Sequence, residues 1–166
     1  MKKNQLIKVV TGLVRFENVN LYEPLSSVGD KKYSITLVIT KQEAETVGKI
    51  KAAYAQLKNE SQALVFKKGW MPESLRDGDK EKSDDVYKGA YFLTATSLAR
   101  PGIVDKDLNP LINVGDIYSG CYGRASITLF TYEFNGKMGI GIGLNNIQKL
   151  RDGKKPAPSG PQIDFG

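Results

Sequence analysis

The 166-residue sequence contains no histidine and a single cysteine, Cys121. Without histidine, the chain cannot form a Ser-His-Asp or Cys-His nucleophilic centre, and zinc sites of the Cys/His kind are excluded as well. One cysteine cannot close an intrachain disulfide, which is typical of proteins from a reducing compartment. Any catalysis would therefore have to use carboxylates, lysine or tyrosine.

Long apolar runs are missing too. The N-terminal apolar segment is interrupted by Gln5, Lys8 and Thr11, so it makes a poor signal peptide. No stretch approaches the roughly 18 apolar residues that a membrane span needs. The sequence therefore predicts a soluble cytoplasmic protein that has no membrane partner.

The chain is basic, with a formal net charge of +6. This balance favours nucleic acid or another polyanion as a partner, but the criterion is weak because many basic proteins bind no nucleic acid. Hydrophobic residues make up 40% of the chain, which is normal for a globular protein. The length suits one domain, since two would each be small and hard to stabilise.

Alternating or β-branched apolar patterns predict five strands. They cover residues 6–16, 33–39 (half-buried), 91–97, 117–134 and 137–148, with a loop at 18–30 and an irregular region at 67–90. A capping box at Thr40–Glu43 predicts a helix that runs to about Asn59. Its apolar stripe consists of Ala44, Val47, Ile50, Tyr54 and Leu57. Its lysines are expected to form a solvated face.

The segment 77–85 carries five acidic residues against two lysines, which predicts an exposed, mobile loop. We expect it to favour solubility, although it could instead compete with nucleic acid. A Mg²⁺ site, as in a nuclease, is a weaker alternative. The pattern Asp77-x-Asp79-x-Glu81 is followed by Lys82, where an EF-hand loop requires glycine.

Asn135-Gly136 separates two alternating segments and predicts a two-residue β-hairpin turn. Paired residue numbers must then add to 271. One face of the hairpin becomes apolar core. The other places bulky rings opposite glycines, through the pairs Phe134–Lys137, Tyr132–Gly139, Phe130–Gly141 and Thr128–Gly143.

Two interpretations of the ring-and-glycine face remain open, and they are compatible. A ring lying across a glycine on the neighbouring strand protects the backbone and stabilises the sheet. Alternatively, the glycines leave a flat path on which unpaired bases can stack against the rings, at about 1–3 kcal/mol per base.

The stretch YSGCYGRASITLFTYEFNGKMGIGIGLNNIQ, 118–148, resembles a family of bacteriophage single-stranded-DNA-binding proteins first catalogued as a domain of unknown function. VRFENVNLYEP (14–24), KYSITLVITK (32–41) and YKGAYFLTATSLARPGIVD (87–105) match the same family in the same order. The resemblance implies a mainly β fold. It would be an OB-fold-like five-stranded barrel with one inserted or capping α-helix and an extended C-terminal hairpin. The domain would cover 1–150, followed by a flexible Pro/Gly-rich tail at 151–166.

The resemblance further implies sequence-independent binding of single-stranded DNA in phage replication or recombination. This would occur in the cytoplasm of the infected bacterium, without catalysis, cofactor or metal. Bases would stack on rings in a basic groove. The candidate contacts are Tyr118, Tyr122, Phe130, Tyr132 and Phe134, with Arg124 and Lys137 as phosphate partners and Trp70 and Tyr91 as further candidates.

The tail segment Ile163-Asp164-Phe165 is a candidate docking site for replication or recombination proteins, although Lys154 and Lys155 depart from the acidic tails usual in such proteins. A β-barrel interaction module that binds protein or carbohydrate is the main alternative function. The sequence leaves open the binding-site size, the cooperativity, RNA binding and whether the chain forms a homo-oligomer.

Overall fold

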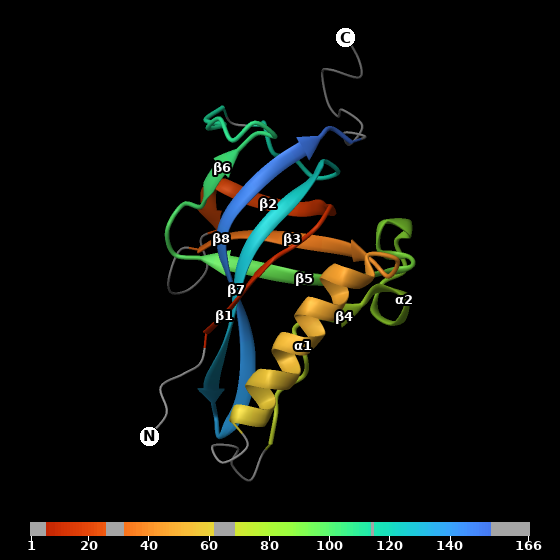
Figure 1. The fold of residues 1–166 in the computed structure, drawn as a ribbon, viewed down its shortest axis with the longest axis vertical. Helices are drawn as coiled ribbons and strands as arrows, with labels where there is room; N and C mark the ends of the chain where they lie inside the picture. The colour runs from red at the N-terminus through yellow and green to blue at the C-terminus, as the bar shows by residue number, and fades with distance from the viewer. Residues whose placement is uncertain (1–5, 26–31, 62–68, 114, 154–166) are drawn as a thin grey trace.

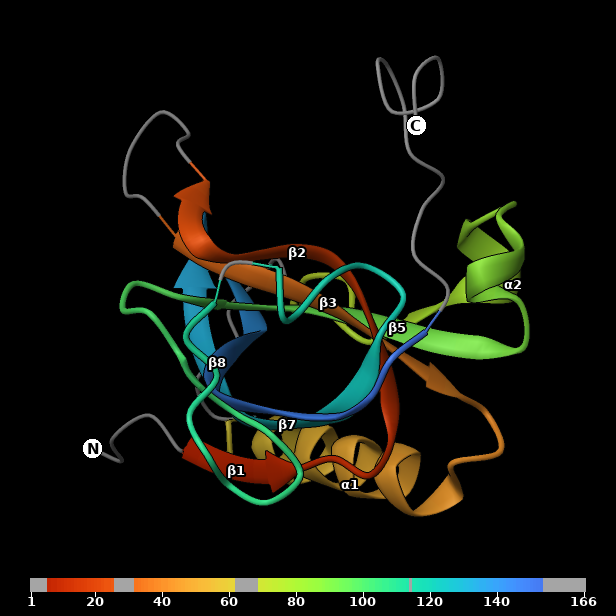
Figure 2. The same ribbon diagram turned by 90° about the horizontal axis from the view of Figure 1, so that it is seen from above.

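Five strands close into a barrel in the computed structural model, which describes residues 6–25, 32–61, 69–113 and 115–153. Going around the barrel, β2 pairs with β3, β3 with β5, β5 with β8, β8 with β7, and β7 with β2. Among these five pairs only β5–β8 is parallel, and Figure 2 shows the closed ring from above. The strands are β2 (Val14–Leu25), β3 (Lys32–Thr40), β5 (Ala90–Ser97), β7 (Tyr122–Phe134) and β8 (Lys137–Arg151). This is the strand order of an OB-fold barrel, so the expected fold class is confirmed.

Three shorter strands extend the sheet. β1 (Leu6–Val10) pairs with β7, β6 (Gly102–Val104) runs parallel to β8, and β4 (Arg76–Asp77) pairs with β5. The single strand expected over 6–16 is therefore wrong, because the chain turns between β1 and β2. Thr11 fixes this turn, since it is buried and its hydroxyl accepts a hydrogen bond from the Ala125 N–H at 3.0 Å.

The loop expected over 18–30 is also wrong in its first part, because β2 continues to Leu25. Leu21 is fully buried in the core. Asn18 and Asn20 lie on the outer side and donate hydrogen bonds to Thr36 and Ser34 of β3. Polar residues in β2 therefore serve as strand residues, although their composition is typical of a loop. Residues 26–31 lie outside the described part of the chain.

The barrel core is built from the inward side chains of alternating positions. Ile35, Leu37 and Ile39 of β3 have no exposed surface, and neither do Ile127 and Leu129 of β7. The expectation that β3 is half-buried is wrong, since its outer residues Ser34, Thr36 and Val38 are buried too. They are covered by β2 asparagines and by side chains that follow β4. This cover comes from segments distant in sequence, so the local pattern of β3 does not indicate it.

Helix α1 (Ala44–Glu60) lies between β3 and β5 in the chain, which confirms the expected inserted helix. The prediction of a capping box at Thr40–Glu43 is wrong, because Glu43 is the N-cap residue and its side chain makes no capping hydrogen bond. Thr40 ends β3 instead. Ala44 is exposed, but the rest of the expected stripe is buried. Burial raises the pKa of Tyr54 to about 12, and its hydroxyl accepts the Leu75 N–H at 3.0 Å. No helix in the described ranges is long and apolar enough to cross a bilayer.

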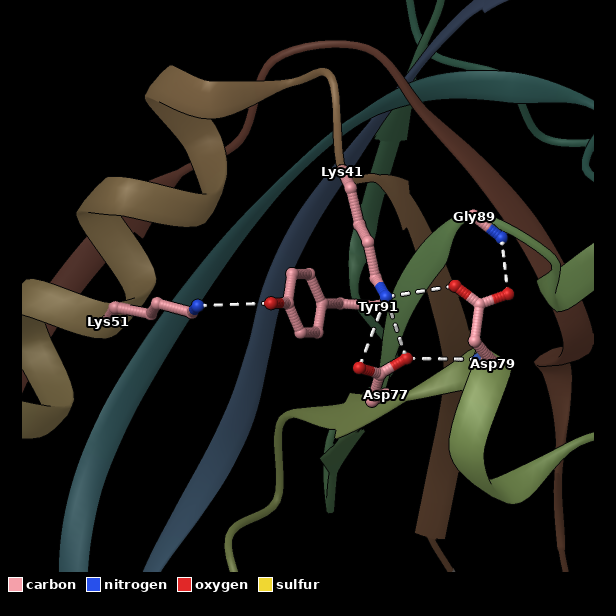
Figure 3. A network of polar contacts seen from close by, with 6 residues as sticks. All are labelled: Lys41, Lys51, Asp77, Asp79, Gly89 and Tyr91. Atoms are coloured by element: carbon pink, nitrogen blue, oxygen red, sulfur yellow. Dashed lines mark hydrogen bonds and ion pairs between the residues drawn. The ribbon is translucent and has the colours of Figure 1, made fainter.

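The acidic segment expected to be a mobile loop is folded instead. It forms β4, α2 (Gly78–Glu81) and a short 3-10 helix at Asp85–Tyr87. Lys41 forms ion pairs of 2.9 Å with both Asp77 and Asp79, and Asp79 also accepts the Gly89 N–H (Figure 3). The Lys41 bond lowers the pKa of Asp77, while the Gly89 bond and then Lys41 lower that of Asp79. The cation that orders this segment is distant in sequence, so the local charge pattern could not reveal it.

The hairpin register is confirmed from the turn to the pair Ile127–Leu144. Asn135 and Gly136 have φ angles of 51° and 81°, as a type I′ turn requires. The register then shifts by one residue at Asn145, whose amide donates to Thr128 Oγ1 at 2.9 Å and Ser126 Oγ at 3.3 Å. The hairpin extends well beyond the barrel (Figure 1). β8 ends at Arg151, and the expected tail lies outside the described residues from 154 onward.

Cys121 is fully buried just before β7, and this burial raises the pKa of its thiol. Because the thiolate is the reactive form, we expect the native protein to react slowly with a thiol reagent such as Ellman's reagent. Unfolding the protein with urea should expose the thiol and make its reaction with the reagent fast. Absorbance at neutral pH with and without urea measures this, and prompt reaction of the folded protein would show that Cys121 is accessible.

Candidate nucleic-acid interface

The rings of Phe130 and Tyr132 lie over glycines of the neighbouring β8 strand. A Cβ atom added to Gly141 would overlap the Phe130 ring, and one added to Gly139 would overlap the Tyr132 ring. The two ring centroids are 6.4 Å apart and the planes are tilted by 55°. Tyr132 remains 37% exposed, so the rings cover the glycine backbone and still present a surface to solvent. We call this pair the hairpin rings.

Strand β1 borders the hairpin rings on the side away from β8. Leu6 lies opposite Phe130, and Lys8 lies opposite Thr128. Both β1 residues are exposed on the same outer face, and Lys8 places a positive charge beside the rings. Lys8 is not among the candidates that the sequence indicates. Lys8 lies beside the hairpin rings because β1 pairs with β7. The local sequence of β1 does not indicate which strand it pairs with.

A band of small and hydroxyl-bearing side chains continues from the hairpin rings around the barrel. Gly143 of β8 lies beside Thr96 of β5, and both positions face outward because their neighbours in sequence point into the core. Farther along, Thr94 shares a 3.1 Å hydrogen bond with Thr36. The outer face of β8, β5 and β3 therefore carries no bulky side chain along this row, which we call the hydroxyl band.

A second group of rings lies at the other end of the hydroxyl band. Tyr87 and Phe92 make an edge contact with centroids 5.1 Å apart, and Lys82 lies 5.2 Å and 5.4 Å from the two centroids. Burial raises the pKa of the Tyr87 hydroxyl. Phe92 is the more accessible ring. This group is not among the candidates predicted from the sequence, although alternation with the core residue Leu93 places Phe92 on the outer face.

Tyr122 stands between two arginines on adjacent strands. Backbone pairing aligns Arg15 of β2, Tyr122 of β7 and Arg151 of β8 in one row across the sheet. The Arg151 guanidinium lies 4.8 Å from the Tyr122 ring centroid. Burial acts to lower the pKa of Arg15, but Glu17, at 2.7 Å, and Tyr122 raise it overall, so Arg15 stays charged. We call these three residues the arginine ladder.

Two other candidates have structural contacts. The Tyr118 hydroxyl donates to Asp152 at 2.8 Å and accepts the Gly153 N–H at 3.1 Å, which anchors the end of β8. The Arg124 Nε donates to the Thr11 carbonyl at 2.9 Å, so it supports the β1–β2 turn while its side chain remains exposed on the outer face. Phe134, 59% exposed, and Lys137 lie beside the hairpin turn, beyond the hairpin rings.

Trp70 and Tyr91 lie on the α1 side of the molecule instead. Both pack against the core, and lysines of α1 cover them. Lys51 donates to the Tyr91 hydroxyl at 3.1 Å, as Figure 3 shows, and Lys58 lies 5.6 Å from the Trp70 ring centroid. Two of the α1 lysines therefore hold the helix against rings, rather than forming only a solvated face.

Exposed rings, hydroxyl groups and cations on the outer face of a five-stranded barrel define an OB-fold protein with a surface suited to a polyanion that carries planar groups. A family model described as the single-stranded-DNA-binding protein of Enterobacter phage Enc34 matches residues 7–160. The chain belongs to this family.

Individual proteins are similar to the chain as well. The chain is 32% identical over 158 residues to putative protein p50 of Acyrthosiphon pisum secondary endosymbiont phage 1. The alignment covers 89% of this chain and 85% of that protein. The C-terminally truncated single-stranded-DNA-binding protein of bacteriophage Enc34 has a TM-score of 0.73 at 23% identity, over 90% of this chain and 88% of that one. The same protein in complex with single-stranded DNA has a TM-score of 0.70 at 22% identity, over 90% and 89%.

A more distant structure shares the fold as well. Gp2.5, the single-stranded-DNA-binding protein encoded by bacteriophage T7, has a TM-score of 0.63 at 13% identity, and the match covers 99% of this chain and 96% of that one.

Proposed function

We propose that this protein binds single-stranded DNA without sequence preference and without catalysis, during phage replication or recombination inside the infected bacterial cell. Membership of the Enc34 family supports the ligand class. The observation that carries the mechanism is the pair of hairpin rings, which lie partly exposed over glycines of the next strand.

The strand would follow the outer face of the barrel. Its bases would stack on Phe130 and Tyr132 at one end of the path. The strand would then cross the hydroxyl band, and a further base would stack on Phe92 at the far end. Lys8 and Lys82 lie beside the two ring groups and would neutralise phosphates. Preference for single strands follows because duplex bases expose no free face to a ring. Stacking tolerates every base, so the binding is not specific for sequence.

A titration with labelled single-stranded and duplex DNA of equal length tests the proposal. We expect tight binding of the single strand only, and log K should fall with log salt with a slope of roughly −0.7 for each phosphate contacted. A module that binds protein or carbohydrate would show no such preference and a much flatter slope. Shortening of the labelled strand in the presence of Mg²⁺ would contradict the proposed absence of catalysis.

Lys8→Gln is expected to reduce the magnitude of the salt slope by about 0.7, because one phosphate contact is lost. The slope is measured by fluorescence anisotropy at several salt concentrations. Lys106→Gln is the matched control, since it removes the same charge from an exposed loop away from the hairpin rings. An unchanged slope in Lys8→Gln would remove β1 from the DNA path.

A further inference from the structure

A cavity of about 350 Å³ adjoins the second ring group, on the outer face of the barrel. Val38 and Val86 line it and also pack with Tyr87 and Phe92, so the cavity begins where the proposed DNA path ends. The arginine ladder forms one side of this cavity. The carboxylate residues Glu43 and Asp85 also line it.

The cavity therefore contains both kinds of hydrogen-bonding group. Arg15 and Arg151 are donors that cannot accept, and the two carboxylates are acceptors that cannot donate. Arg151 makes no ion pair within the part of the chain that the structure describes, and its guanidinium lies against the Tyr122 ring. Its planar group is thus held in place and can stack on a base or bind an oxygen of the ligand.

A simple phosphate site does not suit this composition. Glu43 and Asp85 offset the charge of the two arginines, and Glu17 is already paired with Arg15. Two carboxylates instead favour a ligand with N–H groups, while the arginines favour carbonyl, ring nitrogen or phosphate acceptors. A nucleotide carries both sets of groups, and an exocyclic amino group places its N–H donors at the edge of the base.

We propose that this cavity is a nucleotide subsite that accepts adenine, cytosine or guanine in preference to thymine. A carboxylate accepts a hydrogen bond from the exocyclic amino group that the first three bases carry. Thymine offers only its ring N3–H, which lies between two carbonyl oxygens that carboxylates repel. The inference rests on the proposed function, since the strand must first be held along the outer face. It adds a modest base preference at one position of an otherwise unspecific binder.

The test compares short oligo(dC) and oligo(dT) of equal length, each with wild-type protein and variants. We expect Glu43→Gln/Asp85→Asn to lower the ratio of dC to dT affinity by about fivefold to tenfold, because amide side chains can offer either a donor or an acceptor. Arg151→Gln should weaken oligo(dC) more than oligo(dT). Lys106→Gln is the control, and we expect it to leave the ratio of dC to dT affinity unchanged. Thermal unfolding verifies that each variant is folded.

The outcomes separate the two proposals. If both oligonucleotides bind tightly but no cavity variant changes their affinity ratio, the nucleotide subsite is overturned and the proposed function stands. If the wild-type protein binds neither oligonucleotide, the proposed function itself fails. A ratio that falls only in the cavity variants supports the subsite.

Discussion

Tyr132→Leu should weaken the binding of a mixed-sequence single strand by about 1–3 kcal/mol, the contribution of one base stacked on a ring. Leucine keeps an apolar side chain over Gly139 but has no π-face. The substitution therefore separates the two roles of the ring, which are cover for the glycine backbone and a platform for bases. Fluorescence anisotropy at constant salt measures the loss, and urea unfolding measures any change in stability.

Tyr91→Leu is the matched control, because it removes the same ring from the α1 side of the barrel. We expect it to leave DNA affinity unchanged, even if the loss of its contact with Lys51 lowers stability slightly. Should Tyr132→Leu bind as tightly as the wild-type protein, the hairpin rings support the sheet only. Equal losses in both variants would instead indicate an effect on the fold.

The hairpin was predictable because two independent signals agree on it. The Asn135-Gly136 turn fixes which residues pair, and the period-two pattern fixes which face is core. A shift of one residue would bury the rings and expose Ile140 and Ile142. The inserted helix was predictable for a similar reason, since its apolar stripe has a period that no strand can use.

The rest of the candidate interface depends on irregularities that sequence patterns do not encode. The arginine ladder needs the register shift beside Gly123, which brings Tyr122 opposite Arg151. Lys82 and Tyr87 belong to a segment whose order depends on the distant Lys41. Composition and periodicity describe neighbours along the chain, whereas these residues meet through long-range pairing.

Gly123→Ala should destabilise the protein by about 2–4 kcal/mol, because no room exists for a methyl group there. An added Cβ would overlap the backbone carbonyl oxygen of Gln148 and would lie 2.9 Å from the Phe16 ring, which is fully buried. The backbone can relieve this overlap only by opening the β7–β8 pairing. Urea unfolding, with the midpoint and slope compared with those of the wild-type protein, measures the effect.

Gly143→Ala is the matched substitution on the paired strand, and its expected result is the opposite. A Cβ there makes only ordinary contacts, the nearest being the Thr128 carbonyl oxygen at 3.6 Å. Loss of glycine's freedom in the unfolded chain should leave stability unchanged or raise it by about 0.4–1 kcal/mol. If Gly123→Ala were as stable as Gly143→Ala, β7 and β8 could separate at this point without cost. The position of Tyr122 between its two arginines would then not be fixed by the barrel.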